Sequence, residues 1–186
     1  MKIVVCIKQV PDTTEVKVDP ETNTLIREGV DSVINPFDRY ALEEAVQLRD
    51  TWGGSVTAVS MGPPQAADVL REAVSLGADH VVLVSDKAFA GADTLATSYT
   101  LAGAIRKIGD VDLILCGKQA TDGDTAQVGP GIAVHLDLPQ LIFVRNIRSV
   151  KNSTVVAERM REDGYEVVEA QLPLLISVVK DINLPR

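Results

Sequence analysis

The chain has 186 residues, 46% hydrophobic and 24% charged, which is ordinary for one globular domain and excludes a disordered chain. The 18 basic and 26 acidic residues give a net charge of −8, which argues against nucleic acid or an anionic membrane as the main partner. No apolar run approaches the roughly 18 residues that span a bilayer, and the N-terminus does not resemble a signal peptide. Two widely separated cysteines, Cys6 and Cys116, fit a reducing compartment. We therefore expect a soluble cytoplasmic protein without membrane insertion.

Short apolar runs alternate with helix-like segments through the first three quarters of the chain. Strands are expected at residues 3–7, 55–60, 81–84 and 111–116. Helical spacing of apolar residues follows each of these runs, and Gly53 and Gly77 are expected to end the first two helices. Around residues 15–27, a weak alternation about a turn predicts a hairpin excursion. This order of elements predicts a parallel sheet with helices on both faces.

Two helix starts carry clear signals. Asn35 is a good N-cap, Pro36 suits the first helical position, and Asp38 places a negative charge in the first turn. Asp93 is expected to cap a later helix, whose predicted apolar face includes Leu95 and Tyr99.

The last quarter of the chain is rich in strands. They are expected at residues 140–145, 154–160, 165–170 and 174–179, and Asp163-Gly164 is a strong hairpin turn signal. We expect one domain over residues 1–186, of the α/β class, with a twisted parallel sheet and antiparallel strands added near the C-terminus.

A glycine-rich loop at residues 117–131 is the most informative stretch of the sequence. It follows a predicted strand, and ligands of open parallel sheets bind at the carboxyl ends of strands. Backbone N–H groups of such a loop can wrap a phosphate, helped by the dipole of the following helix. The loop is neither a Walker A sequence nor a Gly-x-Gly-x-x-Gly fingerprint. The pattern alone leaves open whether it binds phosphate or is an elaborate strand–helix turn.

The acidic residues of this loop raise a difficulty, because Asp122 and Asp124 would repel a phosphate if they faced it. In one arrangement Asp124 is the N-cap of the next helix, Gln127 completes a capping box, and Pro130 kinks the second turn. In the other, the helix starts near Gly129 and residues 125–128 form part of the phosphate site.

A second glycine-containing turn, at residues 89–98, also leads into a helix. Hydroxyls of Thr94 and Thr97 lie in or near its first turn. Its simplest interpretation is an ordinary capped helix start, but two such openings beside one sheet suggest a long ligand. Catalytic and metal-binding patterns are poor: His80 and His135 are isolated, and Cys6 and Cys116 are interpreted as buried thiols. We predict no catalytic residue and no metal site.

The sequence resembles the β subunit of electron transfer flavoproteins, most closely the electron-bifurcating and nitrogen-fixation branch. The resemblance runs from Met1 to Arg186 and is most specific in Asn-Pro-Phe-Asp at 35–38 and Asp-Gly-Asp-Thr-Ala-Gln-Val-Gly-Pro at 122–130. Further matching stretches are residues 5–12, 34–45, 61–63 and 117–120. The resemblance implies a Rossmann-like fold of adenine-nucleotide α-hydrolase type and a heterodimer with an α subunit that carries FAD. Family members continue with a C-terminal arm that grips the α subunit, so we expect residues 1–186 to be the nucleotide-binding core.

The resemblance also implies an adenine-nucleotide site. By position, its residues are Cys6, Lys8, Asn35, Pro36, Phe37, Asp38, Met61, Gly117, Lys118, Gln119, Asp122, Gly123, Asp124, Thr125, Ala126, Gln127 and Val128. One branch of the family keeps AMP there as a structural ligand. The other places a second FAD there and takes electrons from NADH. Asp93, Thr94 and Thr97 match the second branch, so FAD is expected and AMP is the alternative.

Three further expectations concern partners. The predicted hairpin at residues 161–165 is aligned with the family's recognition loop, which gives Asp163, Gly164 and Tyr165 a role in partner recognition. The expected redox partner is an acyl-CoA dehydrogenase or a quinone oxidoreductase. A free-standing adenine-nucleotide sensor, or an ATP-cleaving enzyme on the same fold, is the alternative from another functional class. The Ser-Gly-Gly-x-Asp-Ser loop of the ATP-cleaving relatives is absent after the first strand.

Overall fold

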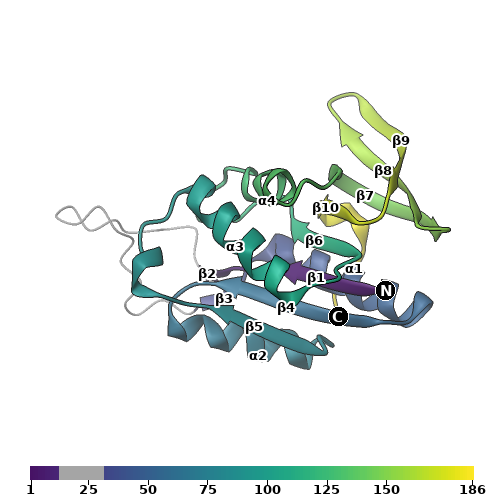
Figure 1. Ribbon diagram of the computed structural model, residues 1–186. Helices are drawn as coiled ribbons and strands as arrows, with labels where there is room; N and C mark the ends of the chain where they lie inside the picture. The colour runs from purple at the N-terminus through teal and green to yellow at the C-terminus, as the bar shows by residue number, and fades with distance from the viewer. Residues whose placement is uncertain (13–31) are drawn as a thin grey trace.

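A computed structural model describes residues 1–12 and 32–186 and shows an eight-stranded sheet flanked by helices (Figure 1). The strands of this sheet, in spatial order, are β5 (His80–Val84), β4 (Ser55–Met61), β1 (Lys2–Cys6), β6 (Leu113–Gly117), β10 (Leu174–Val178), β7 (Gln140–Lys151), β8 (Thr154–Arg161) and β9 (Gly164–Gln171). A two-stranded sheet pairs β2 (Gln9–Pro11) with β3 (Ser32–Ile34). The hairpin predicted at residues 15–27 lies outside the described residues.

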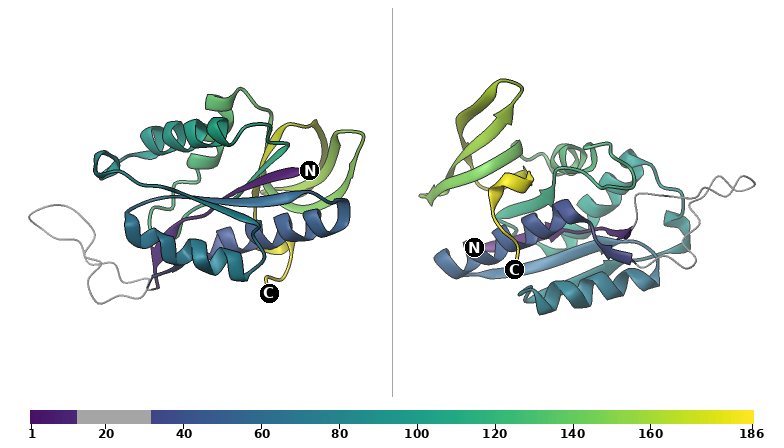
Figure 2. Two further views of the ribbon diagram at one scale, coloured as in Figure 1. Left: turned by 60° about the horizontal axis from the view of Figure 1, so that its bottom comes forward. Right: turned by 180° about the vertical axis from the view of Figure 1, so that it is seen from behind.

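Helices cover both faces of the sheet, as the sequence predicts (Figure 2). Residues of α1 (Pro36–Trp52) and α2 (Ala67–Ser75) join the core on one face. Residues of α3 (Thr94–Ile108) and α4 (Val128–Leu136) join the core on the other face. Short 3₁₀ helices η1 (Pro64–Ala66), η2 (Lys87–Phe89) and η3 (Lys180–Ile182) complete the set. None of the helices in the described ranges is long and apolar enough to cross a membrane.

The centre of the sheet differs from the prediction in one respect. The last apolar run forms β10, which lies between β6 and β7 and runs parallel to both. All five residues of β10 are buried, as expected for a strand covered on two faces. The expected antiparallel extension is confirmed only for β8 and β9, which continue the sheet beyond β7.

The predicted apolar face of α3 was wrong at two positions, because Leu95 and Tyr99 do not belong to it. Leu95 and Tyr99 are 66% and 64% exposed. The buried stripe is set by Ser98, Leu101, Ala102 and Ile105, which recur at helical spacing. Ser98 belongs to it because α4 passes close by: a Cβ on Gly131 would lie 2.6 Å from the Ser98 hydroxyl oxygen.

Strands β7, β8 and β9 form a ribbon that projects from the body of the molecule (Figure 1). The hairpin predicted near Asp163 is present at the tip of this ribbon, but the turn is one residue earlier. Glu162 and Asp163 form the turn, and Gly164 already pairs with Arg161.

Candidate functional site

The sheet has a point at which the chain changes direction. From β1 the chain builds β4 and β5 on one side, then returns to place β6 on the other side of β1. In open α/β sheets, ligands bind outside the carboxyl ends of the two strands at such a point. The predicted loop after β6 lies at this position, beside the segment that follows β1. We call residues 117–128 the cradle loop.

Asp38, in the first turn of α1, links the ends of these two strands. Its carboxylate is buried and accepts a hydrogen bond from the Lys8 backbone N–H at 2.8 Å and another from the Gly117 N–H at 3.1 Å. Burial, the largest effect, raises the pKa of this carboxyl group to about 7, although both hydrogen bonds oppose the shift. The predicted negative charge at the helix start is therefore directed to two neighbouring segments.

Asn35 behaves in the same way. It occupies the N-cap position of α1 as predicted, but its side chain bonds to the cradle loop in place of the first helical turn. The Asn35 amide Nδ2 donates to the Gln119 carbonyl at 2.8 Å, and Oδ1 accepts from the Thr121 N–H at 3.1 Å. The predicted N-cap position is therefore confirmed, but the Asn35 side chain satisfies polar backbone groups of the cradle loop and not those of its own helix.

The two acidic residues of the cradle loop are both bonded to protein groups. Asp122 forms an ion pair with the Lys8 ammonium at 2.7 Å, and the Asp122 side chain is only 4% exposed. The Asp124 carboxylate accepts a hydrogen bond from the Gln119 side chain. Lys8 balances the charge of Asp122, and Gln119 holds the Asp124 carboxylate in place, so neither carboxylate is without a protein partner.

Helix α4 starts at Val128 with Gln127 at the N-cap, which confirms the later of the two predicted helix starts. Asp124 is not the cap. Asp124 and Ala126 instead adopt positive φ angles of 52° and 54°, which turn the chain before the helix. Pro130 falls in the first turn, where its missing N–H has no intrahelical partner to lose, so the predicted kink is avoided.

The glycines of this segment serve close packing more than loop conformation. A Cβ on Gly117 would lie 2.5 Å from the Asp38 carboxylate, and one on Gly129 would lie 2.7 Å from the Cys116 sulfur. Gly117 is therefore required for the approach of α1 to β6, and Gly129 for the approach of α4 to β6. The left-handed conformations that glycine usually provides occur here at Asp124 and Ala126.

The second predicted opening meets the first. Asp93 caps α3 as predicted, accepting from the Ala96 N–H at 2.8 Å. The Thr94 hydroxyl lies 3.3 Å from the Gln127 side-chain oxygen and donates to it. Thr97 is half-buried one turn further along. The starts of α3 and α4 thus lie side by side and are joined by this hydrogen bond.

Other predicted residues lie on β1, β4, β6 and α1. Cys6 and Cys116 lie opposite each other on the neighbouring strands β1 and β6, and both are free thiols. Burial raises the pKa of both thiols, that of Cys6 to about 12. Their interpretation as buried thiols is confirmed. Met61 ends β4, while Pro36 and Phe37 form the start of α1 beside Gly117.

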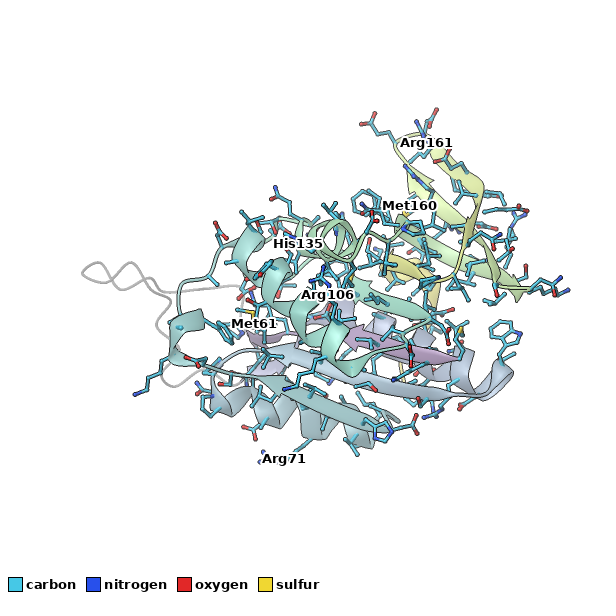
Figure 3. The ribbon with its side chains drawn as sticks, in the orientation of Figure 1. Met61, Arg71, Arg106, His135, Met160 and Arg161 are labelled. Carbon is cyan, nitrogen blue, oxygen red and sulfur yellow. The ribbon has the colours of Figure 1, made fainter. Side chains whose placement is uncertain are left out.

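Some predicted residues lie elsewhere. Asp163, Gly164 and Tyr165 are at the tip of the ribbon, and their role in partner recognition stays a prediction. Figure 3 shows Arg161, beside the tip of the ribbon, apart from Met61 at the end of β4. His135 packs edge-on against Tyr99, and His80 is an exposed residue of the edge strand β5. Within residues 1–12 and 32–186, no group of three or more His, Cys, Asp or Glu side chains could hold a metal ion.

Sequence reasoning missed two neighbours of the cradle loop. The Lys118 N–H donates to the Val178 carbonyl at 2.9 Å, and the Lys118 ammonium lies 5.5 Å from the centre of the Phe143 ring. Phe143 has a φ of 60°, unusual for a bulky residue, at an irregularity in the pairing of β7 with β10. An apolar residue near a positive side chain gives no recognisable signal until the place of β10 is known.

The chain is similar to known proteins of one family. The family model for the electron transfer flavoprotein domain matches residues 22–186. The electron transfer flavoprotein subunit beta of Clostridium acetobutylicum is 55% identical over 186 residues, which is all of this chain and 71% of that protein. The caffeyl-CoA reductase-Etf complex subunit CarD of Acetobacterium woodii is 54% identical over 187 residues, again all of this chain and 71% of the relative. Protein FixA of Bradyrhizobium diazoefficiens is 52% identical over 189 residues, covering 98% of this chain and 66% of the relative. The chain therefore belongs to the electron transfer flavoprotein family and is of the β-subunit type.

Proposed function

We propose that this β-type subunit binds FAD in the cradle loop, pairs with an α subunit that carries its own FAD, and passes electrons between NADH or a dehydrogenase and that second flavin. The observation that carries the choice of FAD is the meeting of two helix starts at Thr94 and Gln127. A mononucleotide needs one phosphate site. A second polar helix start beside the first suits a ligand with a longer polar chain.

The residues of the cradle fit a nucleotide phosphate. The Gln127 side chain accepts from Thr94, so it leaves the backbone N–H groups at the start of α4 free for an anion. Asp122 and Asp124, the acidic groups of the loop, are engaged by Lys8 and Gln119. We infer that the amides of Val128 and Gly129 hold a phosphate and that Thr94 and Thr97 hold the part of the ligand beyond it.

FAD, when bound, supplies the electron-transfer chemistry, and the protein orients it and sets its surroundings. The name of one relative supports a role within a larger assembly, since CarD is a subunit of a caffeyl-CoA reductase-Etf complex. For this chain we expect an acyl-CoA dehydrogenase or a quinone oxidoreductase as the redox partner. The acidic net charge of −8 suits a protein partner better than a polyanion.

Counting cofactors tests this proposal. The chain is purified with its α subunit, and flavin and AMP released by denaturation are quantified per heterodimer. We expect two FAD. One FAD with one AMP would overturn the choice of FAD and assign the site a structural nucleotide, and one FAD without AMP would overturn the site itself.

A pair of threonines on α3 provides the matched variants. Thr94→Val removes the hydroxyl that bonds to Gln127, whereas Thr100→Val removes one that bonds only to the Ala96 carbonyl of its own helix. We expect FAD affinity to fall about fivefold in Thr94→Val, the effect of one neutral hydrogen bond, and to stay unchanged in Thr100→Val. Equal affinity in both variants would contradict a role of the α3 start.

A further inference from the structure

We propose that Asp38 is the positioning residue of the cradle: its carboxylate binds the protein backbone and not the nucleotide, and its protonation loosens the cradle loop. This inference rests on the proposed nucleotide site and adds its regulation by pH. It replaces the expectation that Asp38 is itself a cofactor ligand.

The geometry shows what Asp38 holds together. Its two oxygens are used by two different segments, Oδ2 by the N–H of Lys8 after β1 and Oδ1 by the N–H of Gly117 at the end of β6. Gly117 is the first residue of the cradle loop, and a Cβ there would lie 2.5 Å from Oδ1. The carboxylate is thus in close contact with the backbone on which the loop is built, and 6% of Asp38 is exposed.

The ionised carboxylate satisfies both amides best. It has two charged acceptor oxygens, and each faces one N–H donor. Protonation removes the charge and turns one oxygen into a hydroxyl, which is a much weaker acceptor, so one of the two hydrogen bonds is weakened. The segment held by that bond is then free to move. The Lys8 side chain moves with its backbone, and this disturbs the Lys8–Asp122 ion pair inside the loop.

The surroundings of Asp38 place this protonation near neutral pH. The titratable groups that face it are Cys6 from β1, Cys116 from β6 and Lys8. Both thiols are neutral because burial raises their pKa, so Lys8 is the cation that opposes the effect of burial on Asp38. With the pKa of Asp38 raised to about 7, a modest change in pH alters its charge.

The effect on folding stability has the opposite sign to the effect on binding. The folded state raises the pKa from 3.8, so the proton stabilises the folded form. This contribution is fully present below pH 3.8 and is lost as the pH rises through about 7. The cradle is therefore best ordered at the pH where Asp38 contributes least to folding stability. If Asp38 had only a structural role, folding stability and nucleotide binding would change with pH in the same direction.

Glu44 offers a matched control on the same helix. It is also buried, and burial raises its pKa, but its carboxylate accepts from the Asn183 amide at 3.0 Å, on a segment away from the cradle loop. Asp38→Asn and Glu44→Gln each remove one buried acid with little change in shape. Only the first leaves an NH₂ group facing an N–H donor of the cradle.

The first measurement follows the backbone amides by NMR in the isotope-labelled chain assembled with its α subunit. We expect the Lys8 and Gly117 amides to shift together with a single midpoint near the pKa of about 7. The shared titration should vanish in Asp38→Asn and persist in Glu44→Gln. Separate midpoints, or a titration that survives in Asp38→Asn, would overturn the proposal.

The second measurement is calorimetric titration with FAD and with AMP at about pH 6 and about pH 8, on either side of the pKa of about 7. Wild type should bind about tenfold more weakly at the lower pH, which corresponds to one hydrogen bond to a charged group. Asp38→Asn should bind weakly at both values without losing stability at the higher pH, and Glu44→Gln should follow wild type. If nucleotide affinity did not change with pH while the Lys8 and Gly117 amides titrated, the coupling between Asp38 protonation and nucleotide binding would be refuted. If wild type binds neither nucleotide at either pH, the proposed function fails, and the amide titration alone decides the role of Asp38.

Discussion

Helices α1 and α3 both follow a polar residue of the kind that caps helices, Asn35 for α1 and Asp93 for α3. The Asp93 carboxylate bonds to the third residue of its own helix, as the sequence predicts. Asn35 and Asp38 instead bond to residues 119 and 121 and to the backbone of residues 8 and 117. The same sequence signal thus locates both helix starts but identifies the bonding partners of only one.

The difference follows from where each helix begins. Asp93 is exposed, so its carboxylate finds only water and the N–H groups of its own first turn. Asn35 and Asp38 are buried between the ends of β1 and β6, where backbone amides have left their strands and need partners. A buried polar side chain is used to satisfy the most costly unpaired group near it. At α1 that group belongs to the cradle.

Among variants that affect the two helix starts, Gly117→Ala should have the largest effect on stability, because the added methyl group pushes the start of α1 away from β6. The added Cβ would lie 2.5 Å from Asp38 Oδ1 and 2.6 Å from Phe37 C. We expect the free energy of unfolding to fall by about 3 kcal/mol, at the upper end for overpacking, together with loss of bound nucleotide. Denaturant unfolding measures the first effect. Gly103→Ala, where nothing lies within 4 Å, is the control and should be neutral or stabilising. Equal behaviour of the two variants would refute the close approach.

Asn35→Ala should have the next largest effect. It removes both side-chain bonds to the cradle loop and leaves the Gln119 carbonyl and the Thr121 amide without this partner. Two lost hydrogen bonds predict a decrease of about 2 kcal/mol in unfolding free energy and faster loss of nucleotide on dilution. Asn35→Asp can still accept from Thr121 but cannot donate to Gln119, so it should recover part of the loss. If Asn35→Ala retained nucleotide as well as wild type does, the loop would be held by other contacts.

Asp93→Ala should have the smallest effect, confined to α3. Loss of an exposed N-cap lowers the free energy of unfolding by about 1 kcal/mol, and Asp93→Asn, which retains an acceptor oxygen, should restore most of it. Thermal unfolding of the two variants in parallel measures this. No difference between Asp93→Ala and wild type would mean that the cap contributes nothing, and the contrast between the two helix starts would disappear.

Local patterns predicted much of this molecule. Alternation of apolar runs and helical spacing identified the parallel sheet, the helix boundaries and the loop after β6, because these depend on residues close together in the chain. The place of β10 could not be predicted in this way. A fully buried apolar run fits any central position. The pairing of β10 depends on contacts with β7 across about 35 residues and with β6 across about 60. Val178 and Phe143, the neighbours of Lys118, escaped notice for the same reason.

The acidic loop residues show a second limit. Asp124 and Gln127 match a capping box, yet the helix begins later and Asp124 takes a left-handed conformation. Asp122 is bonded to Lys8, which precedes it by 114 positions. Short-range rules assign such residues to the nearest helix. In the folded chain, Asp122 instead bonds to a residue that follows β1, the strand beside β6.

Hydrogen–deuterium exchange on the heterodimer, stripped of cofactor and then reloaded with FAD, tests the central claim most directly. We predict slower exchange on loading in two segments, residues 117–128 and the first turn of α3, with the ribbon tip at residues 162–165 unchanged. Protection of the ribbon tip without protection of residues 117–128 would contradict the assignment of the cradle.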